Sequence, residues 1–228
     1  LGVDISMMLD ECPPYPCTRD EAAAAMKRTH LWAPRNLAAK REGQAVFGIV
    51  QGGVHEDLRR ESAQTIGSMP FDGFAIGGVS VGEPTEMQHP VVRLTAPLLP
   101  ADKVRYLMGV GHPNDIVNAV ACGVDLFDCV LPTRMARHHC LYTLNGRVNI
   151  AAKKWEDVDE LPDPGSAFPA TARYSAAYLR HLFKVGEPLG ARLATLHNLS
   201  FYARLMAEIR EAIEQGSWPE LCARYAHA

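Results

Sequence analysis

The chain has 228 residues, of which 47% are hydrophobic and 21% charged, and its net charge is −3. This composition is ordinary for a globular protein and allows one large domain or two small ones. No apolar run is long enough to span a bilayer, and the N-terminus lacks the basic-then-apolar order of a signal peptide. The six cysteines include no C-x-x-C pair and are typical of reduced thiols, so we expect a cytoplasmic protein.

Short apolar segments alternate with helix-like segments from the start of the chain. The predicted strands are Val3–Leu9, Ala45–Gln51, Gly73–Val81, Val104–Gly111 and Val124–Leu131. Runs of this kind, bounded by Gly, Pro or charged residues, are typical of strands buried on both faces of a parallel sheet. No Gly-x-Gly-x-x-Gly turn follows the first strand, so the pattern favours part of a (β/α)8 TIM barrel over a Rossmann domain.

The segments between these strands carry helix signals. Thr18 is the predicted N-cap of the first helix, with Glu21 at the capping-box position. The other predicted helices are His55–Ser68, Thr85–Leu99 and Pro113–Cys122. Because the first strand opens the chain without a polar lead-in, we expect that further barrel strands precede Leu1.

After Pro132 the pattern changes. Cys140–Ile150 alternates around Asn145-Gly146, which predicts a β-hairpin with a type I′ turn. Helices are predicted around Arg173–Lys184 and over Pro188–Gln215. We therefore predict two domains: residues 1–135, the C-terminal part of a barrel with about five βα units, and residues 136–228, a hairpin with a helical subdomain and closing helices.

Acidic residues stand at the ends of two predicted strands, where barrel enzymes gather their active sites. Asp128 follows the fifth strand and is suited to act as a nucleophile or acid/base, or else as a turn carboxylate paired with Arg134. Asp10 and Glu11 follow the first strand. A carboxylate there can accept two hydrogen bonds from a guanine-like N–H edge, or the two can form a solvated pair.

The other strand ends are polar or rich in glycine. Gln51 presents an amide that can face a heterocycle or serve as a turn amide, and the glycines at Gly77-Gly78 let backbone N–H groups approach a flat ligand. Tyr106 and Met108 can stack on a base, although a methionine at a strand end is more often part of the core.

The stretch from Cys129 to Trp155 contains no Asp or Glu but five Arg and Lys residues. This favours phosphate contact over a plain solvated hairpin. The histidines are dispersed, and no set of His, Cys, Asp and Glu has the spacing of a metal site. These residues predict an enzyme that acts on nucleic acid.

Five co-linear motifs closely resemble the bacterial tRNA-guanine transglycosylase family. They are DISMMLDECPPYP (Asp4–Pro16), FGIVQGG (Phe47–Gly53), FDGFAIGGVSVGE (Phe71–Glu83), YLMGVG (Tyr106–Gly111) and LFDCVLPTR (Leu126–Arg134). The family is a (β/α)8 barrel that exchanges guanine at the wobble position of tRNA for a deazaguanine, on the route to queuosine. The resemblance implies that fold and that activity for this chain.

The resemblance also implies roles for residues at matching positions. Asp128 matches the nucleophile that attacks the anomeric carbon of the ribose and forms a covalent intermediate with tRNA. Asp10 and Gln51 match residues that hold the N–H and carbonyl edges of the base. Gly78 matches the backbone donor to the carbonyl oxygen of the base.

Further positions concern specificity and tRNA. Val79 replaces a leucine whose backbone carbonyl meets the aminomethyl group, a contact that should survive the change. Val81 is the bacterial-type residue, which favours aminomethyl-deazaguanine over the bulkier queuine. Met108 is a predicted substrate-binding residue, and Arg134 and Arg137 fall in the loop that contacts tRNA in the family.

The family commonly forms homodimers, and it uses an aspartate as general base. Tyr174, Tyr178 and His181 match the family's dimer interface, so we expect a homodimer. The general base would lie before Leu1.

The chain departs from the family at its structural zinc site. The family holds zinc with a Cys-x-Cys-x-x-Cys motif and a later histidine. Here Ser166, Phe168 and Thr171 stand at the cysteine positions, and only His197 remains. Such a set cannot hold Zn²⁺ as thiolates would, so we expect no zinc and no other cofactor. We expect packing around Phe168 and Tyr174 to hold this subdomain.

Three functions compete on these residues. The leading hypothesis is a base-exchange enzyme, and the alternative is a non-catalytic relative that binds tRNA or serves as a partner subunit. Loss of the zinc ligands favours the alternative, whereas retention of Asp10, Gln51, Gly78 and Asp128 favours the enzyme. An unrelated barrel hydrolase would require five coincidental motif matches.

Overall fold

The computed structural model describes residues 2–163 and 171–226. The chain divides into two compact units, one made of residues 1–110 and 118–129 and the other of residues 111–117 and 130–228. The boundary predicted between residues 135 and 136 stays a prediction.

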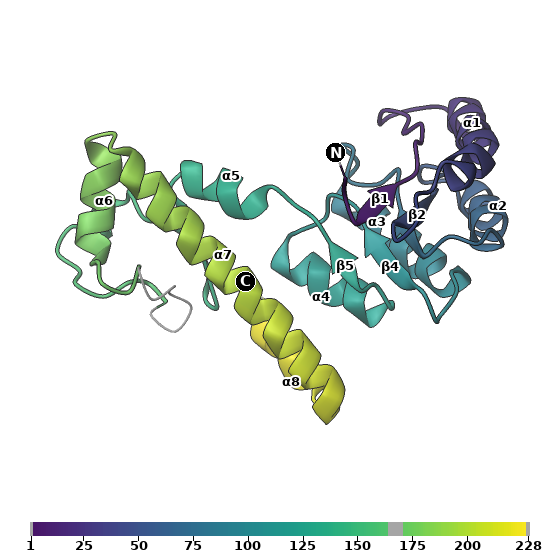
Figure 1. The fold of residues 1–228 in the computed structure, drawn as a ribbon. Coiled ribbons are helices and arrows are strands. Elements are labelled where there is room, and N and C mark those ends of the chain that lie inside the picture. Colours follow the sequence, from purple (N-terminus) through teal and green to yellow (C-terminus); the bar gives the residue numbers. More distant parts are fainter. Residues whose placement is uncertain (1, 164–170, 227–228) are drawn as a thin grey trace. The chain divides into compact units, whose positions relative to one another are not determined.

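The first unit is built on one parallel sheet whose five strands are neighbours in chain order (Figure 1). The strands are β1 (Ile5–Met7), β2 (Ala45–Val50), β3 (Gly73–Ile76), β4 (Val104–Leu107) and β5 (Leu126–Phe127). In-order parallel strands joined by helices are the repeat of a (β/α)8 barrel, and the curled sheet forms an incomplete barrel of this type. The predicted fold class is confirmed.

Helices connect the strands of this unit. They are α1 (Arg19–Ala38), α2 (Glu56–Gly67), α3 (Thr85–Thr95), which continues into the 3₁₀ turn η1 (Ala96–Leu98), and α4 (Pro113–Ala121), whose residues 113–117 are counted with the other unit. Thr18 caps α1 through the predicted capping box: its hydroxyl accepts from the Glu21 N–H, while the Glu21 carboxylate accepts from the Thr18 N–H.

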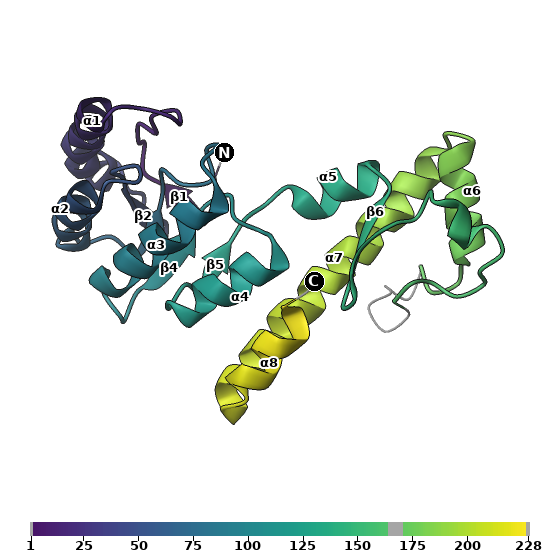
Figure 2. The same cartoon turned by 180° about the vertical axis from the view of Figure 1, so that it is seen from behind.

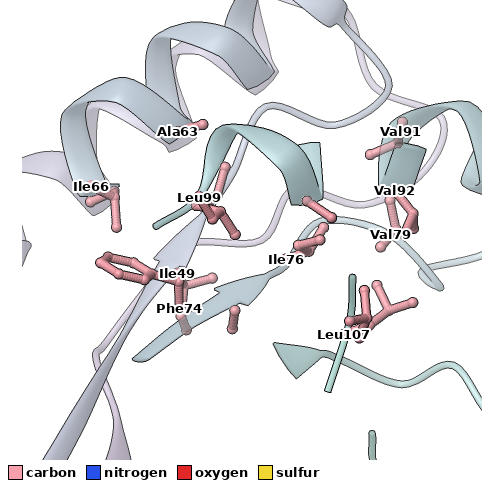
Figure 3. Packing of buried hydrophobic residues seen from close by; sticks show 14 of the residues in the cluster. Ile49, Ala63, Ile66, Phe74, Ile76, Val79, Val91, Val92, Leu99 and Leu107 are labelled. Carbon is pink, nitrogen blue, oxygen red and sulfur yellow. The ribbon is translucent and has the colours of Figure 1, made fainter. Parts of the chain in front are cut away.

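The core of the first unit lies between the sheet and its helices. Ile49, Phe74, Ile76 and Leu107 come from three neighbouring strands, and each is almost fully buried. Figure 3 shows Phe74, Ile76 and Leu107 together with residues of α2 and α3, such as Val92. Ile49 pairs with Ala75 and therefore lies on the other face of the sheet. Burying branched side chains on both partners fixes the helices against the sheet, and therefore fixes where each strand ends.

The second unit combines a hairpin with four helices (Figure 2). Its elements are α5 (Leu131–Arg137), β6 (Cys140–Thr143), β7 (Gly146–Asn149), the 3₁₀ turn η2 (Lys153–Trp155), α6 (Ala176–Lys184), α7 (Pro188–Gln215) and α8 (Trp218–Tyr225). The predicted hairpin and the helix over Pro188–Gln215 are confirmed. No helix in the described ranges combines the length and the apolar character needed to cross a membrane.

Two local predictions are wrong. Thr143 pairs with Gly146, so Leu144 and Asn145 form the hairpin turn. A type I′ turn needs a positive φ at both central residues, and in this segment only Gly146 has one, at 96°. The fifth strand ends at Phe127, and α5 begins at Leu131 in the segment expected to be a loop, because proline suits the first turn of a helix.

Asn198 on α7 connects three segments of the second unit. Its side-chain oxygen accepts from the Tyr142 N–H at 2.9 Å, and its amide nitrogen donates to the carbonyls of Pro132 and Cys140, both at 3.0 Å. The asparagine is fully buried, so these bonds satisfy backbone groups that water does not reach.

Replacing Asn198 with alanine leaves three buried backbone groups without partners. We expect Asn198→Ala to lower the free energy of unfolding by about 3 kcal/mol, measured by urea denaturation. Leu199→Ala, on the exposed side of the same helix, is the control and should change it by less than about 0.5 kcal/mol. Equal losses in both variants would contradict the role given to Asn198.

Candidate active site

The ends of four strands lie at one edge of the sheet. Level pairing of Val50 with Ile76, of Ile76 with Leu107, and of Leu107 with Phe127 places the last residues of β2 to β5 side by side. The residues that follow, among them Gln51, Gly77, Met108 and Asp128, therefore leave the sheet at its carboxyl edge, where barrel enzymes bind their substrates.

Asp128 is exposed at this edge and held through one of its two oxygens. Its Oδ1 accepts from the Tyr106 hydroxyl at 2.5 Å and from the Gly109 N–H at 2.8 Å. Its Oδ2 has no hydrogen-bond partner among the described residues. A carboxylate that is oriented through one oxygen and open at the other is suited to act as a nucleophile.

Tyr106 makes a contact that the sequence did not predict. Its hydroxyl donates to Asp128, and stacking of its ring on a base stays a prediction. Burial raises the pKa of the Tyr106 phenol, and the hydrogen bond to Asp128 raises it further. The phenol therefore keeps its proton at neutral pH and remains a donor.

Asp10 and Gln51 are brought together. Gln51 is fully buried, and its side-chain nitrogen donates to Asp10 Oδ2 at 2.6 Å. The Gln51 side-chain oxygen has no partner within the described part of the chain. Glu11 instead pairs with Arg28 on α1, so only one of the two predicted carboxylates meets Gln51.

Gly78 allows the chain to pass close to this pair. Its φ is +67°, and a Cβ there would lie 2.5 Å from the Gln51 side-chain oxygen and 3.1 Å from Nη2 of Arg59. Only glycine fits beside these two side chains, and the approach of its backbone to a ligand stays a prediction. A pocket beside Gly78 is lined by residues that include Tyr15, Gly53, Val81 and Glu83.

The loop after β3 is held by backbone contacts. The buried Glu83 carboxylate accepts from the N–H groups of Ser80 and Val81. Ser80 has a φ of +63°, and its hydroxyl donates to the Gly109 carbonyl at 3.0 Å, which joins this loop to the loop after β4. A non-glycine residue in this region marks a conformation that its surroundings impose.

Two predicted substrate residues lie partly or wholly in the core. The side chain of Val79 is buried and lies near Val92 (Figure 3), so a contact from Val79 to a ligand must come from its backbone. Met108 is half-buried and packs against the same core. Its role in binding a base stays a prediction.

Arg59 on α2 is a residue at this edge that the sequence did not single out. It is fully buried and donates to the carbonyls of Gly53 at 2.7 Å, of Val50 at 3.1 Å and of Gly77 at 2.6 Å. Burial lowers the pKa of Arg59 to about 10, so it stays charged at neutral pH. Its spacing could have indicated burial, because Arg59 shares one helical face with the buried residues 62, 63 and 66.

The predicted tRNA and dimer residues lie in the second unit. Arg134 and Arg137 are exposed in the last turn of α5, three residues apart, and belong to a helix where a loop was expected. The ring of Tyr174, just before α6, stacks on that of Tyr178 on α6 with centroids 5.4 Å apart, and His181 on α6 is exposed. Their roles in binding stay predictions.

The zinc positions offer a poor donor set. Ser166 and Phe168 lie outside the described residues, Thr171 is buried, and His197 is buried with Nε2 at 2.9 Å from the Tyr142 carbonyl. Within residues 2–163 and 171–226, no three His, Cys, Asp or Glu side chains gather as metal ligands would. A hydroxyl and one imidazole do not replace three thiolates, so these residues do not fit the family's zinc.

The contact between Tyr106 and Asp128 predicts a change in titration. Replacing Asp128 with asparagine removes a negative charge that disfavours the phenolate, so the pKa of Tyr106 should fall while remaining above its ordinary value because of burial. Ultraviolet absorbance during an alkaline titration measures it, with Tyr106→Phe to assign the signal. The control is Asp102→Asn, at an exposed position, which should leave the titration unchanged. An unchanged pKa in Asp128→Asn would contradict the contact.

The chain matches known proteins along its whole length. The family model described as "Queuine tRNA-ribosyltransferase" matches residues 1–228. A queuine tRNA-ribosyltransferase from Thiobacillus denitrificans is 51% identical over 227 residues, which are 99% of this chain and 62% of that protein. One from Herpetosiphon aurantiacus is 54% identical over 216 residues, 94% of this chain and 55% of that protein.

A third relative gives the same result. The queuine tRNA-ribosyltransferase from Halalkalibacterium halodurans is 50% identical over 215 residues, 93% of this chain and 57% of that protein. The chain thus spans between 55% and 62% of the length of these three curated relatives. With its incomplete barrel and the residues gathered at the carboxyl edge of the sheet, the chain belongs to the queuine tRNA-ribosyltransferase family.

Proposed function

We propose that the protein is a tRNA-guanine transglycosylase that exchanges the wobble guanine of tRNA for a 7-deazaguanine in queuosine synthesis. The observation that carries this proposal is the Asp128 carboxylate, oriented through Oδ1 with Oδ2 open, at the sheet edge that also holds Asp10, Gln51 and Gly78. The printed names of the relatives, which describe transfer of ribosyl groups involving queuine and tRNA, support the same reaction.

In the first step, Oδ2 of Asp128 attacks the anomeric carbon of the ribose. The glycosidic bond breaks, and guanine leaves with the bonding electron pair and takes up a proton. In the second step, the incoming deazaguanine attacks the same carbon from the vacated face and loses its proton, while the ester bond to Asp128 breaks and returns its electron pair to the carboxylate. Two inversions retain the configuration, as in two-step glycoside hydrolysis.

The base would be recognised by groups of both polarities. The Asp10 carboxylate can accept from the N–H edge of a guanine ring, while the Gln51 amide and the Gly78 N–H can donate to its carbonyl oxygen. Val81 lines the neighbouring pocket, and by the resemblance to the family it favours a small aminomethyl substituent. We propose aminomethyl-deazaguanine as the incoming base for this reason.

The second unit would contact tRNA and a second copy of the chain. Arg134 and Arg137 are exposed cations in a stretch without acidic residues, which suits binding to phosphates. The stacked rings of Tyr174, just before α6, and Tyr178, on α6, offer an aromatic surface for a homodimer contact. Both assignments extend the proposal and follow the resemblance to the family.

A non-catalytic relative that binds tRNA is the second candidate. The residues at the zinc positions favour this candidate. A subdomain that has lost its zinc ligands has also changed in any property that depended on bound zinc. The intact geometry around Asp128 favours the enzyme.

Exchange of labelled guanine into tRNA tests the proposal. We expect Asp128→Asn to abolish exchange and to abolish a denaturant-stable adduct between the protein and tRNA, because an amide is not a nucleophile as a carboxylate is. Asp102→Asn, an exposed aspartate before β4, is the matched control and should keep full activity. The assay is run on this chain and on any longer polypeptide that contains it.

The two candidates give different results in that assay. Exchange that depends on Asp128 establishes the transglycosylase. Specific tRNA binding by folded protein without exchange or adduct in any form establishes the non-catalytic relative.

We propose further that the second unit is stable without zinc. Its apolar core contains Leu141, Ile150, Leu179 and Leu193, with Tyr174 packed against it, and this core joins the hairpin to α6 and α7. We expect elemental analysis of purified protein to find less than about 0.1 zinc per chain, and a strong chelator to leave thermal unfolding unchanged. Stoichiometric zinc, or unfolding induced by the chelator, would contradict this.

A further inference from the structure

Arg59 is a buried cation without a carboxylate partner. Its guanidinium is fully buried, and none of the ion pairs among the described residues includes it. Three carbonyls, those of Gly53, Val50 and Gly77, take the place of the lost water. Nη2 has no partner in the described part of the chain. Such a charge is costly to bury, which suggests a use beyond packing.

The shortest of these contacts is to Gly77. Nη1 of Arg59 donates to the Gly77 carbonyl at 2.6 Å, a distance typical of a charge-assisted hydrogen bond. That carbonyl and the N–H of Gly78 belong to one peptide group. A hydrogen bond to the carbonyl end of a peptide polarises the whole group and makes its N–H a stronger donor.

Gly78 lies beside the residues proposed to hold the base. A Cβ at Gly78 would lie 2.5 Å from the side-chain oxygen of Gln51, and the Gln51 amide donates to Asp10 at 2.6 Å. Burial raises the pKa of the Cys12 thiol, the charge of Asp10 raises it further, and a hydrogen bond from the Gly78 backbone lowers it. The polarised peptide is therefore next to the residues proposed to hold the base.

We infer that Arg59 is a positioning residue that strengthens the Gly78 N–H, through the Gly77–Gly78 peptide, as a donor to the carbonyl oxygen of the bound base. The inference rests on the proposed function and deepens it. Arg59 itself does not touch the base. When guanine leaves with the electron pair of the glycosidic bond, part of that charge moves to its carbonyl oxygen, so a stronger donor there favours departure.

A purely structural role for Arg59 predicts a different result. A residue that only braces the ends of β2 and β3 would, when removed, weaken the binding of every purine. A residue that polarises one donor would weaken only the binding of purines with a carbonyl at the matching position. Guanine and 2-aminopurine differ at that carbonyl and at the N1 proton that accompanies it, and the contact of that proton with Asp10 is the same in every variant. The change in the ratio of their affinities, from the unchanged protein to each variant, therefore separates the two roles.

The experiment compares Arg59→Gln with Arg59→Lys. Glutamine keeps one donor without charge, whereas lysine keeps the charge without the planar fork. We expect Arg59→Gln to weaken guanine binding about tenfold and 2-aminopurine binding less than about twofold. Arg59→Lys should keep most of the preference for guanine over 2-aminopurine that the unchanged protein has. Equilibrium dialysis with labelled purines gives the affinities, and circular dichroism shows whether each variant is folded.

Arg60→Gln is the matched control. Arg60 is the next residue on α2, is exposed, and pairs with Glu56 at 2.7 Å, so its replacement should change neither affinity. The inference is overturned if Arg59→Gln weakens both purines equally, if lysine and glutamine behave alike, or if both variants lose their folded structure. The proposed function is tested separately, on the unchanged protein alone. It is overturned if that protein binds guanine no more tightly than 2-aminopurine.

Discussion

The level, parallel pairing of β2 to β5 is the constraint on which the site depends. Side chains buried between the sheet and α2 and α3 fix that pairing, because sliding one strand by a residue would turn its buried side chains away from the core. The four strands therefore end together, and the loops that follow start from neighbouring points. Asp128 meets Tyr106, and Gln51 meets Asp10, only because their strands end at one edge.

Much of this arrangement could be predicted from the sequence. Apolar runs separated by helices indicate a parallel sheet, so the strand positions were predictable. The capping box at Thr18 and the helix over Pro188–Gln215 were predictable from their own local patterns. Gln51 and Asp128 stand directly after strands, and Asp10 follows β1 by three residues, which places all three at one edge. The pairing of Asp10 with Gln51 follows from that placement.

What the sequence did not predict depends on distances between segments. Nothing local to Tyr106 shows that its hydroxyl reaches Asp128, because the contact requires the register of β4 against β5. The partners of Arg59 are backbone carbonyls, which every sequence contains and no pattern marks. The turn expected around Asn145 does not form because Thr143 pairs with Gly146. That pairing depends on the register of both strands and not on the turn residues alone.

The contact between Gln51 and Asp10 has a consequence for how a base enters. Without a ligand, the Gln51 amide donates to the very carboxylate that would accept from the ring, so each occupies part of the other's binding capacity. A purine must displace this internal bond, and its arrival exchanges hydrogen bonds more than it adds them. In the proposed reaction, the bond between Gln51 and Asp10 would lower the affinity for guanine and for the incoming deazaguanine alike. Guanine would then leave readily, and selection of the deazaguanine would depend on the groups by which the two bases differ.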